Sequence, residues 1–354
     1  MILDFYDIII IIKKTFLFTY SIFYGGLYVF MKKYFLIFFA LIQFSFVFAS
    51  KARFTCDEYI LNVEYNEVII PGDAIFVKLS VTNPKNHKKN KNDFDKKAVI
   101  QLNNEKKVIT ASPLYEIYKN KKQNFTQLLG GIPVSQWLSD GNYSLTLTFA
   151  DSEENVKEFI LPSTFKTRQF NEEILELDEK NTAIKTDNSP QRISQIDKLT
   201  SILDTYIPTD IFSTKPFKIP LGSLNYTSYF GDRRVYKYTN GKSSTSYHYG
   251  NDYGVPVGTD VFACADGKVV LAENRISTGY SVVIEHLPGL FSLYYHLDSL
   301  CVSEGDIVKQ SDLIGKSGET GLATGPHLHW EVRLNSVAVR PEFFFENFTF
   351  DLTK

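Results

Sequence analysis

The sequence predicts a mostly β protein in three parts: an N-terminal β-sandwich, a helical connector and a C-terminal domain built on an antiparallel sheet. Short runs that alternate apolar and polar residues recur over residues 50–165 and again over 216–345, as half-buried strands do. Turn-forming Gly, Pro, Asn and Asp bound these runs. Only residues 166–215 follow a helical period. A length of 354 residues accommodates two such domains.

The first 49 residues predict export. Met31 is followed by two lysines and the apolar run 34–48, which leads to a small-residue cleavage pattern, Val47-Phe48-Ala49. This order is that of a secretory signal peptide over residues 31–49. Residues 1–30 are either an over-extended start or a membrane segment that tethers the chain. The complete signal beginning at the second methionine favours the first interpretation. Both place the rest of the chain in the periplasm or cell envelope.

Residues 50–165 are predicted to form an antiparallel sandwich, immunoglobulin-like in outline. The predicted strands are 58–64, 74–81, 97–102, 107–110 and 143–149. The lysine-rich stretch 85–97 is interpreted as a solvated loop, with contact to an anionic polymer as the alternative. This half contains no catalytic constellation.

The connector, residues 166–215, is predicted to contain helices over 171–180 and 190–204. Pro190 suits the first position of the second helix. That helix carries an apolar stripe of Ile193, Ile196, Leu199, Ile202 and Leu203, expected to pack on a neighbouring domain.

Charge and cysteines exclude several classes of function. The net charge of −2 gives no reason to expect a nucleic-acid partner. The three cysteines, Cys56, Cys264 and Cys301, form no C-x-x-C pair, which excludes a thiolate zinc knuckle and a thioredoxin-like motif. Cys264 and Cys301 form either a bridge or two separate thiols, and spacing does not decide between them.

Two histidines, His327 and His329, lie in a run that reads as a strand. Residues two apart in a strand point to the same face. Both imidazoles are therefore expected on one face, with Leu328 and Trp330 on the other. A metal ion is the object that two such imidazoles would share, whereas surface or core histidines are the plain alternative.

A second metal-binding pattern is His248 with Asp252, four residues apart around Gly250. Gly250 favours an extended segment, where an even spacing again leaves both side chains on one face. With one histidine of the later pair they provide three zinc ligands. A fourth position then remains for water, as in a catalytic rather than a structural zinc site.

Six short motifs in order carry a family resemblance. They are Phe230-Gly231-Asp232-Arg233; His248-x-x-x-Asp252; Pro256-Val257-Gly258-Thr259 with Ala265-Asp266-Gly267-Lys268-Val269; Tyr294-Tyr295-His296-Leu297; Gly305-Asp306-Ile307-Val308; and Gly315–Gly321 running into Thr324–Val332. Residues 220–342 thus resemble the lysostaphin/LytM-type zinc metallopeptidases, which cut peptide bridges in bacterial peptidoglycan. Each motif alone is weak evidence, but six in the family's order are strong evidence.

The resemblance implies a role for each matched residue. His248, Asp252 and His329 correspond to the ligands of one zinc ion per chain, and His296 and His327 to two non-ligand histidines at the catalytic centre. His286 corresponds to a structural histidine. The expected substrate groove is walled by the loop 235–247, with Tyr236, Tyr238 and Tyr247, and by the Gly-rich loop 315–325.

The implied function is that of an exported zinc endopeptidase that hydrolyses peptide cross-links of peptidoglycan. The alternative is a LytM-like scaffold that activates another wall hydrolase, either catalytically silent or inhibited by its own N-terminal module or connector. Among substrates, D,D-cross-links to a diamino acid are favoured for an exported chain without wall-binding repeats, with glycine bridges as the alternative.

Overall fold

The computed structural model describes residues 50–55, 59–83, 97–105, 107–150, 156–346 and 348. The predictions for residues 1–30, the signal peptide 31–49, Cys56 and the lysine-rich stretch up to residue 96 lie outside these residues. No helix in the described part of the chain is long and apolar enough to cross a membrane. Residues 49–354 form one compact unit.

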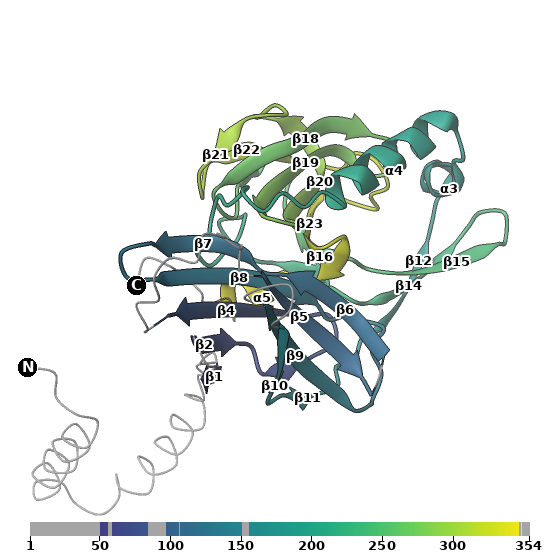
Figure 1. Ribbon diagram of the computed structural model, residues 1–354. Helices are drawn as coiled ribbons and strands as arrows, with labels where there is room; N and C mark the ends of the chain where they lie inside the picture. The colour runs from purple at the N-terminus through teal and green to yellow at the C-terminus, as the bar shows by residue number, and fades with distance from the viewer. Residues whose placement is uncertain are drawn as a thin grey trace, which may run out of the picture. The chain divides into compact units, whose positions relative to one another are not determined.

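The N-terminal module consists of two antiparallel sheets (Figure 1). One contains, in spatial order, β1 (Ser50–Thr55), β2 (Ile60–Tyr65), β4 (Ala74–Thr82), β8 (Phe125–Pro133) and β7 (Tyr115–Asn120). The other contains β10 (Val156–Leu161), β9 (Tyr143–Ala150), β5 (Lys97–Asn104) and β6 (Lys107–Pro113), while β3 (Val68–Ile69) pairs with β11 (Thr164–Phe165). Alternate side chains such as Leu79, Ile100 and Leu147 fill one core. The mostly β class is confirmed; the immunoglobulin-like topology stays a prediction.

The connector contains β12 (Glu172–Glu176), α3 (Glu179–Thr186) and α4 (Pro190–Leu203). The helix predicted over 171–180 is wrong. Its first half is a strand, β12, paired in parallel with β14 (Arg233–Lys237). The open edge of β14 satisfies the backbone of β12 and overrides the helix propensity of its glutamates. The helix starts later, where the Asp178 side chain accepts from the Asn181 N–H.

The predicted second connector helix is confirmed as α4, with Pro190 in its first turn and the Ser189 side chain as N-cap. Only part of its apolar stripe is packed against the rest of the protein. Leu199, Ile202 and Leu203 pack on the C-terminal sheet, whereas Ile193 and Ile196 are exposed. The expectation that the whole stripe is covered is wrong, because the N-terminal part of the helix meets the end of β18 and the turn after it through the polar side chains of Arg192 and Gln195.

The C-terminal domain is a strongly curved antiparallel sheet. Its main path runs β13 (Tyr226–Ser228), β16 (Gly250–Gly254), β23 (His327–Leu334), β20 (Leu290–Leu300), β19 (Gly279–Leu287), β18 (Gly267–Arg275) and β21 (Ile307–Val308). The remaining elements are β17 (Asp260–Phe262), β22 (Leu313–Ser317), β24 (Val337–Val339) and α5 (Phe343–Glu346). The hairpin β14–β15 (Ser243–Tyr247) joins β12 in a separate three-stranded sheet.

The N-terminal module and the C-terminal domain share a hydrophobic core. Phe76 of β4 packs against Phe344 and Phe348, with ring centroids 6.1 and 4.9 Å apart. Beside them, the buried Asp73 carboxylate accepts from Arg340 at 2.8 Å. The module is therefore part of the support of the C-terminal domain, which would expose aromatic side chains without it.

Neither described cysteine is in a disulfide: Cys264 is a buried thiol and Cys301 an exposed one. Of the two alternatives for this pair, the structure has the separate thiols.

Candidate metal centre

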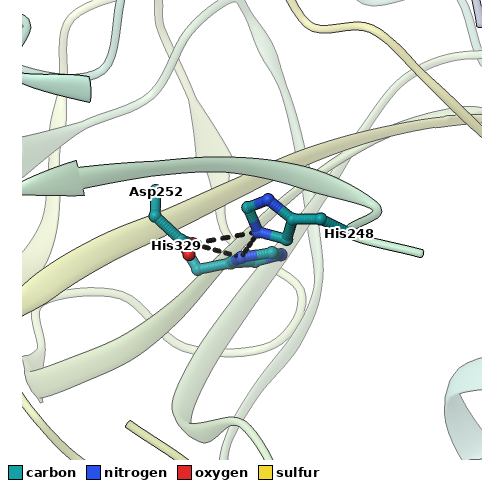
Figure 2. A group of neighbouring side chains, drawn as sticks. All are labelled: His248, Asp252 and His329. Carbon is teal, nitrogen blue, oxygen red and sulfur yellow. Dashed lines mark hydrogen bonds and ion pairs between the residues drawn. The ribbon is translucent and has the colours of Figure 1, made fainter. Parts of the chain in front are cut away.

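Strand pairing brings the predicted ligands together. Asp252 of β16 and His329 of β23 are direct cross-strand partners, which places their side chains side by side on one face. His248 lies just before β16 and turns its ring back over the same point. Figure 2 shows the three side chains directed toward one another. All three are buried.

The distances fit a shared cation. His248 Nε2 lies 3.1 Å from Asp252 Oδ1 and 3.0 Å from His329 Nδ1, and the latter two atoms are 2.7 Å apart. Ligand atoms bound to one tetrahedral zinc at about 2.0–2.1 Å are roughly 3.3 Å from each other. Small outward shifts would therefore complete the geometry.

The outer partners of the two imidazoles fix their tautomers. His248 Nδ1 lies 2.9 Å from the Tyr229 carbonyl oxygen, and His329 Nε2 lies 3.0 Å from Glu331 Oε1. Each outer nitrogen therefore donates its proton, and the inner nitrogen of each ring presents a lone pair to the shared point whenever that ring is neutral. Two lone pairs and a carboxylate oxygen at one point repel one another unless a cation lies between them.

The pKa values follow the same arrangement. Burial raises the pKa of Asp252, but the two histidines outweigh burial and hold it well below its usual range. Burial lowers the pKa of His248. Burial also opposes the charged form of His329, but Asp252 and Glu331 raise its pKa to about 9. A proton on His329 and a metal ion would thus compete for one position.

Further charged groups orient the ligands. Arg234 of β14 donates to Asp252 Oδ2 and leaves Oδ1 to face the imidazoles. The same guanidinium donates to Glu173 of β12 at 3.0 Å. Arg333 donates to Glu331 at 2.7 Å. Burial raises the pKa of Glu331, but Arg333 and His329 lower it to about 2, so it is ionised and orients His329.

His296 and His327 lie next to each other beside the ligands, with ring centroids 4.7 Å apart. Their Nδ1 atoms donate to the carbonyls of Thr320 and Gly325, both at 2.7 Å. Nε2 is therefore the nitrogen that each ring has left for other partners, and that of His327 lies 3.7 Å from Asp252 Oδ1. Burial, with the neighbouring rings of His327 and His329, lowers the pKa of His296 to about 3.

The backbone of His296 has a φ of +60° inside β20. This left-handed conformation costs about 1 kcal/mol or more for a residue other than glycine. It is held by the His296 N–H, which donates to the Thr278 carbonyl at 2.8 Å. The strand is thus locally bent in a way that aims this imidazole at the ligand cluster.

Comparison with known proteins agrees with this geometry. Residues 246–341 match Peptidase family M23. The C-terminal domain is an M23 peptidase domain. The resemblance predicted from the motifs is therefore confirmed for this part of the chain.

Relatives cover only part of the chain. Over 132 residues, 37% of the chain, it is 36% identical to a protein described as an uncharacterized metalloprotease of Buchnera aphidicola, covering 34% of that protein. Over 106 residues, 30% of the chain, it is 39% identical to the peptidoglycan DD-endopeptidase ShyA of Vibrio cholerae, covering 24% of that protein. The chain spans about a third or less of these relatives.

One solved structure resembles both domains. It is a crystal structure from Pseudomonas aeruginosa described as an M23 peptidase, 21% identical, with a TM-score of 0.52. The alignment covers 79% of this chain and 96% of that one. This likeness concerns the fold, and it extends well beyond the M23 domain.

A cavity of about 240 Å³ opens beside the ligands of the M23 domain. It is lined by Glu173, Leu175, Leu177, Thr227, Ser228, Arg234, Tyr236, Asp252, His296, Leu322, Thr324, Gly325, Pro326 and His327. Of the three tyrosines predicted for the groove, Tyr236 lines the cavity. Tyr238 bonds to Ser244, and Tyr247 packs against Trp137 at 4.2 Å between centroids; neither lines this cavity.

Sequence reasoning missed the residues that support and enclose the site. Glu331 carried a usable signal, because it follows His329 by two positions and so shares its face of β23. Arg234 and Glu173 carried none, since they meet only through the pairing of β12 with β14.

Proposed function

We propose that this chain is an exported zinc metallo-endopeptidase that hydrolyses peptide cross-links of bacterial peptidoglycan. The observation that carries the proposal is the convergence of His248 Nε2, Asp252 Oδ1 and His329 Nδ1 beside two further histidines. The M23 domain and the similarity to a peptidoglycan DD-endopeptidase support the substrate class.

Two imidazoles and one carboxylate suit zinc, and the cavity next to Asp252 provides room for a fourth ligand. One zinc ion per chain is proposed, held by His248, Asp252 and His329. When bound, zinc would supply Lewis-acid activation of water and of the scissile carbonyl. Glu331 and the Tyr229 carbonyl keep the two imidazoles in the tautomers that binding requires.

His296 and His327 are proposed to move the proton. Each presents Nε2 toward the cavity with Nδ1 held by a backbone carbonyl. One Nε2 would accept a proton from the attacking water and return it to the leaving amine. The imidazolium formed in this way could also donate a hydrogen bond to the oxygen that gains negative charge before it passes the proton on.

The location proposed for this activity is the periplasm or cell envelope. The signal peptide predicted over residues 31–49 and a substrate that lies outside the cytoplasm support it. If residues 1–30 are translated, they would tether the enzyme to the membrane.

A second candidate, a scaffold inhibited by its own connector, has one observation in its favour. Glu173, Leu175 and Leu177 of the connector segment line the cavity, and α3 bonds to Ala323 and Thr239, next to cavity-lining segments. These side chains border the cavity rather than fill it, which favours a wall of the active site over a plug. The scaffold interpretation expects bound zinc without hydrolysis.

The test uses the full chain, because Phe76 of the module covers the aromatic core of the M23 domain. Purified protein is expected to hold about one zinc per chain and to release fragments from cell-wall sacculi, identified by mass spectrometry. His329→Ala is expected to lose both zinc and cleavage, while His87→Ala, outside the M23 domain, retains both. Zinc-loaded protein that leaves sacculi intact would contradict the proposal.

A further inference from the structure

Helix α3 follows β12 in the connector (Figure 1) and bonds to two segments near the cavity. The buried Asn181 side chain donates to the Ala323 carbonyl at 3.2 Å, between the cavity-lining residues Leu322 and Thr324. One position on, the Thr182 hydroxyl accepts from the Thr239 N–H at 3.3 Å, at the tip of the hairpin β14–β15. Each bond ties α3 to a segment that carries cavity-lining residues, Leu322 and Thr324 on one side and Tyr236 of β14 on the other, so α3 lies close to the site.

Lys185 on this helix directs its ammonium group to a cavity residue. Its Nζ lies 3.9 Å from the centroid of the Tyr236 ring, and Tyr236 lines the cavity. The aromatic face stabilises the cation but leaves N–H donors of the ammonium free. Within the described residues, Lys185 Nζ has no carboxylate at ion-pair distance and no hydrogen-bond acceptor. A half-buried ammonium without an anion is an unusual arrangement.

The neighbouring charges do not compensate Lys185. Arg192 donates to the Ser277 hydroxyl at 3.1 Å and to the backbone carbonyls of Lys185 and Asp187, none of which carries charge. Arg234 is already neutralised by Asp252 and Glu173. Burial, with Arg192 and Arg234, lowers the pKa of Lys185 to about 8, so it remains mostly protonated at pH 7. An uncompensated positive charge therefore lies against Tyr236, a residue of the cavity lining.

We propose that Lys185 binds a free carboxylate of the peptide cross-link while the cross-link lies in the cavity. This inference rests on the proposed function and narrows its substrate class. A cross-link made through a diamino diacid keeps a free carboxylate next to the scissile amide, whereas a glycine bridge contains none. The subsite thus selects the diamino-diacid cross-link and makes Lys185 a specificity-determining residue.

The test compares two cross-linked peptides that differ only at this carboxylate, free in one and a primary amide in the other. The wild-type chain with zinc is expected to cleave the free acid with a kcat/KM roughly tenfold or more above that of the amide, the value of one charge-assisted contact. Lys185→Gln is expected to bring the two rates together by slowing only the free acid. Lys185→Arg should retain part of the preference.

Lys180→Gln provides the matched control, because Lys180 lies exposed on the same helix and the change removes the same charge; its preference is expected to equal that of the wild type. Thermal melting and zinc content confirm that each variant is folded and loaded. An unchanged preference in Lys185→Gln, or a wild type that cleaves both peptides or a glycine bridge equally well, overturns the assignment.

Failure of the proposed function gives a different result. If the zinc-loaded chain cleaves neither peptide, the peptidase proposal fails, and the two peptides then serve as binding probes in calorimetry. Tighter binding of the free acid by the wild type but not by Lys185→Gln would still support the subsite, and equal binding would overturn it.

Discussion

The cavity beside the metal ligands has two walls that are held in different ways. The wall of the M23 domain consists of residues from β16, β20 and β23, interior strands of one sheet, and of the loop 322–326, and the proposed ligands on these strands are buried. The connector wall consists of Glu173 and Leu175 of β12, an edge strand, and of Leu177 just after it; α3 follows and is attached through single hydrogen bonds such as that from Asn181 to Ala323. The first wall is held by strands paired on both sides, whereas the second is held by few contacts.

This difference suggests that the two walls have different roles: one in metal binding and hydrolysis, the other in the choice of peptide. On the M23 wall each ligand has an outer partner that fixes its orientation, as Glu331 does for His329. On the connector wall the cavity is lined by Leu175 and Leu177 and approached by Lys185. Substitutions on the first wall are therefore expected to remove metal or hydrolysis, and substitutions on the second to alter which peptide is accepted.

The largest effect is expected at His296. His296→Ala removes the proposed proton-transfer group, which makes no hydrogen bond to the proposed metal-binding atoms in the described structure. The rate kcat is expected to fall by roughly 10²–10⁴-fold while about one zinc per chain is retained. Zinc analysis and cleavage of sacculi measure the two separately. Normal cleavage by His296→Ala would show that its assigned role is wrong.

A smaller effect is expected at Glu331, which orients a ligand without binding the metal. Glu331→Gln keeps the size of the side chain but weakens its hold on the Nε2 proton of His329, so zinc affinity is expected to fall roughly 10–100-fold. Titration with a competing chelator measures it, with exposed Glu176→Gln as the control. Saturating zinc should restore most of the activity. Unaltered zinc affinity would contradict the orienting role.

The same comparison shows how far sequence reasoning reaches. The M23 wall was predictable because its ligands follow strand periodicity: His327 and His329 share one face of β23, and Leu328 and Trp330 lie in the core on the other. The connector wall was not. Its strand β12 has the composition of a helix and becomes a strand only by pairing with β14, about 60 residues later. The local sequence pattern could not predict this pairing, and so it could not predict that Glu173 lies beside Arg234.

Glu173 of the connector contacts Arg234, which in turn contacts Asp252. A substitution at Glu173 therefore tests whether the connector influences metal binding. Its Oε2 accepts from Arg234 and from the Ser228 hydroxyl, both at 3.0 Å. Glu173→Gln leaves Arg234 less compensated beside Asp252 and is expected to weaken zinc binding about 2–5-fold, since the pair is partly exposed. Titration with a competing chelator measures the zinc affinity of Glu173→Gln, which is compared with that of Glu331→Gln. An equally large loss in both variants would mean that the connector is part of the metal site.

The smallest effect is expected at Asn181. It decides whether α3 helps to position the substrate or blocks its entry to the cavity. Asn181→Ala removes the bond to the Ala323 carbonyl and loosens α3 by about 1 kcal/mol. Asn181 Oδ1 has no partner among the described residues, so its loss offsets part of this. If α3 positions substrate, kcat/KM falls about 2–5-fold with zinc content unchanged. If α3 blocks entry, the same change raises kcat/KM.

Asn188→Ala, at an exposed residue of the α3–α4 link, is the control and should match the wild type. Because the two interpretations predict opposite signs, even a small change in rate separates them.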